Sequence, residues 1–142
     1  MTPDRLIVLR ETYRREGLGL LQYVRQTAPY ATRTDRPIVE RIMGMAAEEG
    51  RILEKMADEL LAGRTDAPRL GGFPTTFTNF NYFAVRKLLP LLVQDAERLI
   101  AALRRAAGGG EPSLEQELMS VKLKHLTEMN AFTESVTTAT AG

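Results

Sequence analysis

Residues 64–78 are the least regular stretch of this chain, and they limit how its helices can be connected. They lack helical periodicity and contain Pro68, Gly71, Gly72 and Pro74, which favour turns. The segment before them has a helical pattern of about 28 residues, which is a length of about 42 Å. Fifteen extended residues reach at most about 50 Å. The stretch is therefore long enough to cross a whole helical bundle.

Apolar residues recurring every three to four positions predict four helices, two before this stretch and two after it. Thr2, followed by a proline and an acid, is typical of a helix start. Ser113 and Gln116 have the spacing of a capping box. We expect residues 133–142 to form a flexible tail. The predicted helices span about residues 3–28, 35–62, 79–107 and 114–132.

The connections decide the expected topology. Short first and last connections with a long crossover at 64–78 predict an all-α, four-helix bundle of up-down-down-up topology, in a single domain covering residues 1–142. A plain up-and-down bundle with an elaborated middle loop is the alternative.

Composition excludes several classes of function. The chain has 19 basic and 18 acidic residues, and its arginines are scattered, so we expect no nucleic-acid partner. The sequence contains no cysteine, which rules out disulfides, zinc–thiolate sites and thiol catalysis and is compatible with a reducing compartment. The N-terminal apolar run at 6–9 is too short for a signal peptide or a membrane span. We therefore expect a cytoplasmic protein without a membrane partner.

Charged residues interrupt the apolar stripes of three predicted helices. Glu16 and Glu49 fall at core-facing positions, and a buried carboxylate must be paired, protonated or metal-bound. His125, the single histidine, lies on the apolar stripe of the last helix, with Lys122 three residues before it. Residues three apart share a helix face, so these two side chains point the same way.

Two motifs resemble a known superfamily. The run 48–56, Glu-Glu-Gly-Arg-Ile-Leu-Glu-Lys-Met, is similar to the second-helix segment of ferritins, in which a Glu pair precedes a ligand His. Glu16 followed by Tyr23 resembles their first-helix pattern. The resemblance to the ferritin-like superfamily implies a bundle in which one Glu from each of two helices and a Glu-x-x-His from each of the others bind two metal ions.

The chain departs from that pattern at three positions. Ile52 stands where the second-helix His ligand belongs, and Lys122 replaces the fourth-helix Glu, although His125 keeps its place. Leu92 stands at the third-helix Glu position, with Asp95 one turn away as a substitute. The metal ligands that the resemblance still implies are Glu16, Glu49, His125 and Asp95.

These departures favour a metal-free interpretation. We expect the Lys122 ammonium to neutralise Glu16 and Glu49 in a buried charge cluster that also contains His125. The predicted function is a non-catalytic interaction or ligand-holding module that has lost its di-metal centre and needs no cofactor. The alternative is a ferritin-like metal-binding protein or oxidase with a mononuclear or di-iron site holding iron or manganese. A helical binding protein for a hydrophobic small molecule is a third hypothesis.

Two further groups of residues have simpler interpretations. The charged residues around Glu49 are expected to form a solvated helix face with weak ion pairs; they are Glu48, Arg51, Glu54 and Lys55. Five aromatic residues are expected to clamp the crossover onto the bundle and, where exposed, to favour a homodimer; they are Phe73, Phe77, Phe80, Tyr82 and Phe83.

Overall fold

The computed structural model describes residues 2–27, 29–63, 70–81, 83–107 and 113–141. Within these ranges the chain is helical, with no strand beyond an isolated bridge between Tyr30 and Ala84. The predicted all-α class is confirmed. The helices are α1 Pro3–Gly17, α2 Leu20–Thr27, α3 Arg36–Ala62, the 3₁₀ helix η1 Thr75–Phe80, α4 Val85–Ala107 and α5 Leu114–Ala141.

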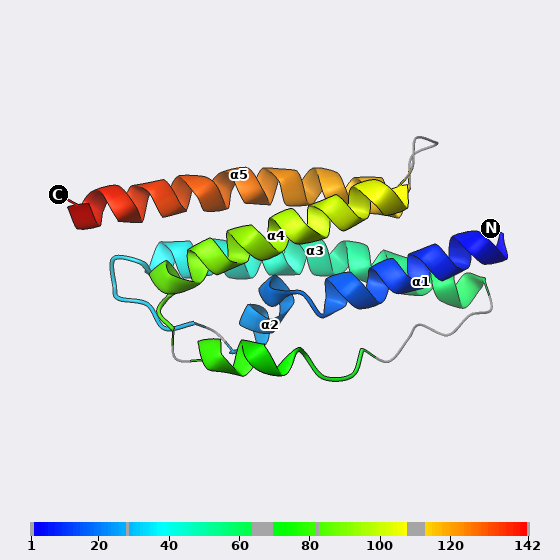
Figure 1. Ribbon diagram of the computed structural model, residues 1–142, viewed down its shortest axis with the longest axis horizontal. Coiled ribbons are helices and arrows are strands. Elements are labelled where there is room, and N and C mark those ends of the chain that lie inside the picture. Colours follow the sequence, from blue (N-terminus) through cyan, green and yellow to red (C-terminus); the bar gives the residue numbers. More distant parts are fainter. Residues whose placement is uncertain (1, 28, 64–69, 82, 108–112, 142) are drawn as a thin grey trace.

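The long helices lie side by side along one axis (Figure 1). α1 and α5 run in one direction, α3 and α4 run in the other, and the two termini lie at opposite ends. The end of α3 and the start of α4 are therefore far apart, and residues 70–81 lie along the bundle between them. Residues 64–69 of the predicted crossover are outside the described residues.

The expectation of one continuous first helix is wrong. α1 ends at Gly17 and α2 begins at Leu20, whose backbone N–H donates to Asp95 Oδ2 on α4 at 2.7 Å. Asp95 thus caps α2 from another helix. A Cβ on Gly19 would lie 2.9 Å from Leu99 Cδ1, so the glycine allows α4 to approach closely. The helical segment is therefore interrupted between α1 and α2, where Gly19 packs against α4 and Asp95 can cap α2.

The local capping signals behave as predicted at two helix starts. The N–H of Arg5 donates to Thr2 Oγ1 at 3.2 Å. Ser113 and Gln116 form the reciprocal capping box at 3.2 and 3.3 Å. The last helix, however, extends beyond its predicted end near residue 132, because α5 continues to Ala141.

Asp35 behaves differently from a cap. Its side chain makes no capping hydrogen bond to α3. The buried carboxylate instead accepts two hydrogen bonds from Arg86 of α4, at 2.5 and 3.1 Å. This contact joins the start of α3 to the start of α4.

Aromatic rings hold the crossover against the bundle. The Tyr23 ring meets Phe73 edge to face at 5.1 Å and Phe77 at 5.4 Å, within the preferred range for aromatic pairs. Centroids of successive rings are between 5.4 and 6.4 Å apart in the row Phe73, Phe77, Phe80 and Phe83. Tyr82 lies outside the described residues. The four described phenylalanines are partly buried against the core, so only part of each ring remains exposed for the homodimer contact that we expect.

The apolar core is divided into two clusters by a layer of charged residues. On α3, Met45 belongs to one cluster and Ile52 to the other, with the buried Glu49 between them. On α5, Met129 and Leu118 are separated in the same way by Lys122 and His125. The charges at core-facing positions therefore form one internal layer across the bundle.

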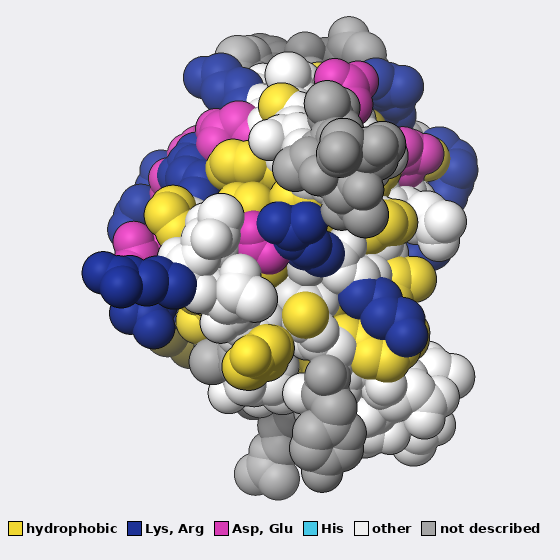
Figure 2. Space-filling view, turned by 90° about the vertical axis from the view of Figure 1, so that its left-hand side faces the viewer, with side chains coloured by type: hydrophobic (Ala, Val, Ile, Leu, Met, Phe, Trp, Pro, Cys, Tyr) yellow, Lys and Arg dark blue, Asp and Glu magenta, His cyan; other side chains and the backbone are white. Residues whose placement is uncertain are grey.

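No helix in the described ranges combines the length and hydrophobicity that a membrane crossing requires. On the end face shown in Figure 2, basic and acidic side chains are interspersed with hydrophobic ones.

Candidate functional site: a buried charge cluster

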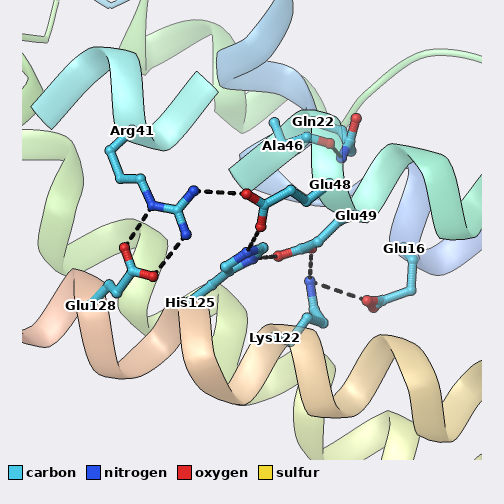
Figure 3. A network of polar contacts seen from close by, with 9 residues as sticks. All are labelled: Glu16, Gln22, Arg41, Ala46, Glu48, Glu49, Lys122, His125 and Glu128. Atoms are coloured by element: carbon cyan, nitrogen blue, oxygen red, sulfur yellow. Dashed lines mark hydrogen bonds and ion pairs between the residues drawn. The ribbon is translucent and has the colours of Figure 1, made fainter. Parts of the chain in front are cut away.

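Lys122 lies at the centre of the charged layer. Its Nζ is 2.6 Å from Glu49 Oε1 and 3.1 Å from Glu16 Oε1 (Figure 3). The three residues come from α5, α3 and α1, and none is more than 4% exposed. The structure thus brings together the three side chains that the sequence places on apolar stripes.

His125 extends the cluster from the next turn of α5. Its Nδ1 lies 2.7 Å from Glu49 Oε2 and its Nε2 lies 2.6 Å from Glu48 Oε2. An ionised carboxylate only accepts hydrogen bonds, so both ring nitrogens must donate, which requires the imidazolium form. Burial lowers the pKa of His125, but the hydrogen bonds with Glu49 and Glu48 outweigh it and raise the pKa above its ordinary value.

The two central acids respond differently to burial. Burial raises the pKa of Glu49, but Lys122 and His125 together hold it below its ordinary value. For Glu16, burial is the larger effect and Lys122 the smaller, so the pKa of Glu16 is raised. Lys122 is within ion-pair distance of Glu16 Oε1, yet neither carboxyl oxygen of Glu16 receives a well-aligned hydrogen bond. Glu49 is therefore the fully paired acid and Glu16 the under-paired one.

Arg41 and Glu128 complete the network toward the surface. Arg41 Nη1 donates to Glu48 at 2.7 Å, and its Nε and Nη2 each donate to Glu128 at 2.7 Å. Such a bidentate pair is a strong form of charge-assisted hydrogen bond. The same contacts lower the pKa values of Glu48 and Glu128.

The charges of the network balance if one acid is neutral. Its three cations are Lys122, His125 and Arg41, and its four acids are Glu16, Glu48, Glu49 and Glu128. Four negative and three positive charges would leave one uncompensated negative charge. Glu16, whose pKa is raised by burial and which has no aligned donor, is the acid of the network that takes up a proton most readily.

Glu48 is the principal site residue that sequence reasoning missed. Its side chain is 36% exposed and pairs with Arg41, as expected for a solvated helix face, but it also contacts the buried His125, which the sequence did not indicate. The sequence does contain spacings that suggest the rest of the network toward the surface. Arg41 and Glu48 are two helical turns apart and share a face of one helix. His125 and Glu128 are three residues apart and share a face of another. Lys55 does behave as expected, in an exposed pair with Glu117.

The residues present do not fit a di-metal centre. The Lys122 ammonium lies where it contacts both central acids, and Ile52 packs in the second apolar cluster. The structure does not bring Asp95 into the charge cluster, because its carboxylate accepts from the first N–H of α2 and from Arg98. Across the described part of the chain, no three His, Asp or Glu side chains are grouped to hold a metal ion.

The charge network should give the protein its highest stability in mildly acidic solution, between the ordinary pKa values of Glu (4.5) and His (6.5). The raised pKa of His125 means that its contribution is complete below 6.5 and is lost as the pH rises through the folded-state value. The raised pKa of Glu16 means that its contribution is complete below 4.5 and is lost as the pH rises through its folded-state value, so a smaller decline already begins inside this range. The lowered pKa values of Glu48, Glu49 and Glu128 mean that their contributions are lost as the pH falls below 4.5. Urea unfolding at a series of pH values measures this profile.

The variant His125→Gln is the control for the expected loss of stability above pH 6.5. It keeps a polar side chain but cannot titrate, so its free energy of unfolding should fall less steeply than that of the wild type above pH 6.5. Equal slopes in the two proteins would contradict the assignment of that decline to His125.

Comparisons with known protein families, curated proteins and solved structures found no match to this chain. The ferritin-like resemblance therefore rests on the motifs in the sequence alone.

Proposed function

We propose that this chain is a ferritin-like bundle that has lost its di-metal centre and acts as a non-catalytic interaction or ligand-holding module. The observation that carries the proposal is the Lys122 ammonium, 2.6 Å from Glu49 and 3.1 Å from Glu16. In the ferritin-like pattern these two acids would be metal ligands and residue 122 a third acid. A cation attached to the chain neutralises the acids as a metal ion would.

The helix directions support this ancestry. α3 and α4 run in the same direction, which requires a long connection of the kind found in ferritin-like bundles (Figure 1). The acids and the residues at 122 and 125 come from α1, α3 and α5 and converge at mid-height between two apolar clusters. That is the location at which a bundle of this type would hold its metals.

The alternative is a mononuclear or di-iron site that holds iron or manganese with fewer protein ligands than usual. One observation favours it. Neither oxygen of the buried Glu16 carboxyl receives an aligned hydrogen bond from the described residues, and Oε2 also has no ion-pair contact, so it could accept a ligand. A metal there would have to displace Lys122 from Glu49 and break one of the His125 contacts. For this reason we favour the metal-free function, without a cofactor and without catalysis.

Metal analysis tests the proposal directly. Protein purified from iron- and manganese-supplemented cultures should contain far less than one metal ion per chain by inductively coupled plasma mass spectrometry. The variant Glu49→Gln, prepared in parallel, should have the same background content. Stoichiometric metal in the wild type that is lost in Glu49→Gln would overturn the proposal.

A cytoplasmic location and a homodimer belong to the same proposal. The absence of cysteine from the sequence supports the first, because it is compatible with a reducing compartment. For the second, light scattering coupled to size-exclusion chromatography should give twice the chain mass of 15.8 kDa, and the mass of a single chain would exclude it.

A further inference from the structure

A cavity of about 290 Å³, open to the surface, lies beside the break between α1 and α2. Its walls come from α1, α2, α3 and the crossover, and residues that matter for its chemistry are Tyr13, Arg25, Gly50, Leu53, Leu70 and Phe73. Its volume is close to the lower end of the range for small-molecule sites, about 300 Å³. The break between α1 and α2 contributes to it, since Gly17 and Leu18 line the wall.

Gly50 explains how the polar part of this cavity is built. It lies in the interior of α3, where glycine weakens a helix relative to alanine. A Cβ at this position would lie 2.8 Å from Arg25 Nη1. The glycine therefore admits the guanidinium of Arg25 to the surface of α3, and any larger residue would push it away.

Arg25 is exposed at the rim of this cavity, and its charge is not paired there by any described residue. Within the described ranges, it makes no ion pair or hydrogen bond, in contrast to Arg41 and Arg86. The amide nitrogen of the neighbouring Gln22 is already engaged, because Nε2 donates to the Ala46 carbonyl at 2.9 Å. A planar guanidinium with free donors is well suited to a carboxylate, which it can bind through two parallel hydrogen bonds.

The opposite wall of the cavity is apolar. Leu53 is 8% exposed, and Leu70 and Phe73 are partly buried where the crossover covers α3. A Cβ on Gly17 would lie 2.7 Å from Leu70, so this glycine admits Leu70 to the cavity as Gly50 admits Arg25. The cavity thus has one cationic and one hydrophobic side.

We propose that this cavity binds a small monocarboxylate with an apolar body, such as a short fatty acid, with its carboxylate on Arg25 and its body against Leu53, Leu70 and Phe73. The inference rests on the ligand-holding part of the proposed function and names its ligand class. Glu54 lines the same cavity and is exposed, so its charge opposes an anionic ligand. Arg25 and Glu54 should therefore affect binding in opposite directions.

The test is a titration with octanoate, with octan-1-ol as its uncharged analogue, followed by amide chemical shifts. Octanoate should bind saturably and shift the amides of Gly50 and Leu53. Arg25→Gln should weaken octanoate binding about five- to tenfold, as expected for one partly screened charged hydrogen-bond partner, and leave octan-1-ol binding unchanged. Glu54→Gln should strengthen octanoate binding.

Two further variants separate binding from folding. Gly50→Ala displaces the guanidinium while favouring the helix, so it should weaken octanoate binding without lowering stability. Arg10→Gln removes an exposed arginine of α1 that does not line the cavity, and it should bind octanoate as the wild type does.

Failure of this inference and failure of the proposed function give different results. No saturable octanoate binding, equal binding by Arg25→Gln and the wild type, or weaker binding by Glu54→Gln would overturn the carboxylate site and leave the metal-free cluster in place. Site-bound metal in the purified protein would overturn the proposed function whatever the titration shows.

Discussion

Replacing Lys122 with methionine should lower the free energy of unfolding by about 3–5 kcal/mol, the usual effect of removing one partner from a buried ion pair. Methionine keeps much of the length of the lysine side chain but removes the ammonium that contacts Glu16 and Glu49. Both acids would then remain in the core without their shared cation. Chemical unfolding at neutral pH, followed by circular dichroism, measures the loss.

Two comparisons isolate the charge effect. Lys124→Met alters an exposed lysine on the same helix and should change stability by no more than about 0.5 kcal/mol. Adding Glu16→Gln and Glu49→Gln to Lys122→Met should recover much of the loss, because replacing a whole buried ionic group costs less than breaking it. A loss below about 1 kcal/mol for Lys122→Met would show that the acids do not depend on this lysine.

Combining Ile52→His with Lys122→Glu should give a variant that binds iron stoichiometrically. The double variant removes the central cation and adds an imidazole and a carboxylate at the two positions where the ferritin-like pattern has ligands. Together with Glu16, Glu49 and His125, these groups supply nitrogen and oxygen ligands suited to iron. Iron content after anaerobic loading is the measurement.

Ile52→His alone is the matched control, because it retains Lys122 and should bind no iron. If the double variant is unfolded without metal, recovery of its helical circular dichroism on addition of Fe(II) also shows that it binds iron. A folded double variant that binds no iron would show that the ferritin-like alignment of these helices is wrong.

The helix positions could be predicted where their signals are local. Thr2 and the Ser113–Gln116 box determine helix starts through hydrogen bonds within a few residues. The break between α1 and α2 depends on Asp95, which is 75 residues from the amide that it caps. Nothing in the periodicity of the first segment reveals that partner, so the sequence predicts one continuous helix.

The same distinction applies to the candidate site. Glu16, Glu49, Lys122 and His125 are noticeable in the sequence because charges on an apolar stripe must be compensated. Arg41, Glu48 and Glu128 look like ordinary surface charges, and their role depends on how closely α3 and α5 approach. The cavity at Arg25 could not be predicted at all, since it follows from the unexpected break in the first helix.

The layer of charges between the two apolar clusters also determines how the helices are aligned along their length. If α5 slid past α3 by one turn, about 5.4 Å, Leu118 or Leu126 would replace Lys122 opposite Glu16 and Glu49. Leucine would satisfy an apolar core but would leave two buried acids without a cation. The cluster thus disfavours misaligned bundles that hydrophobic packing alone would tolerate.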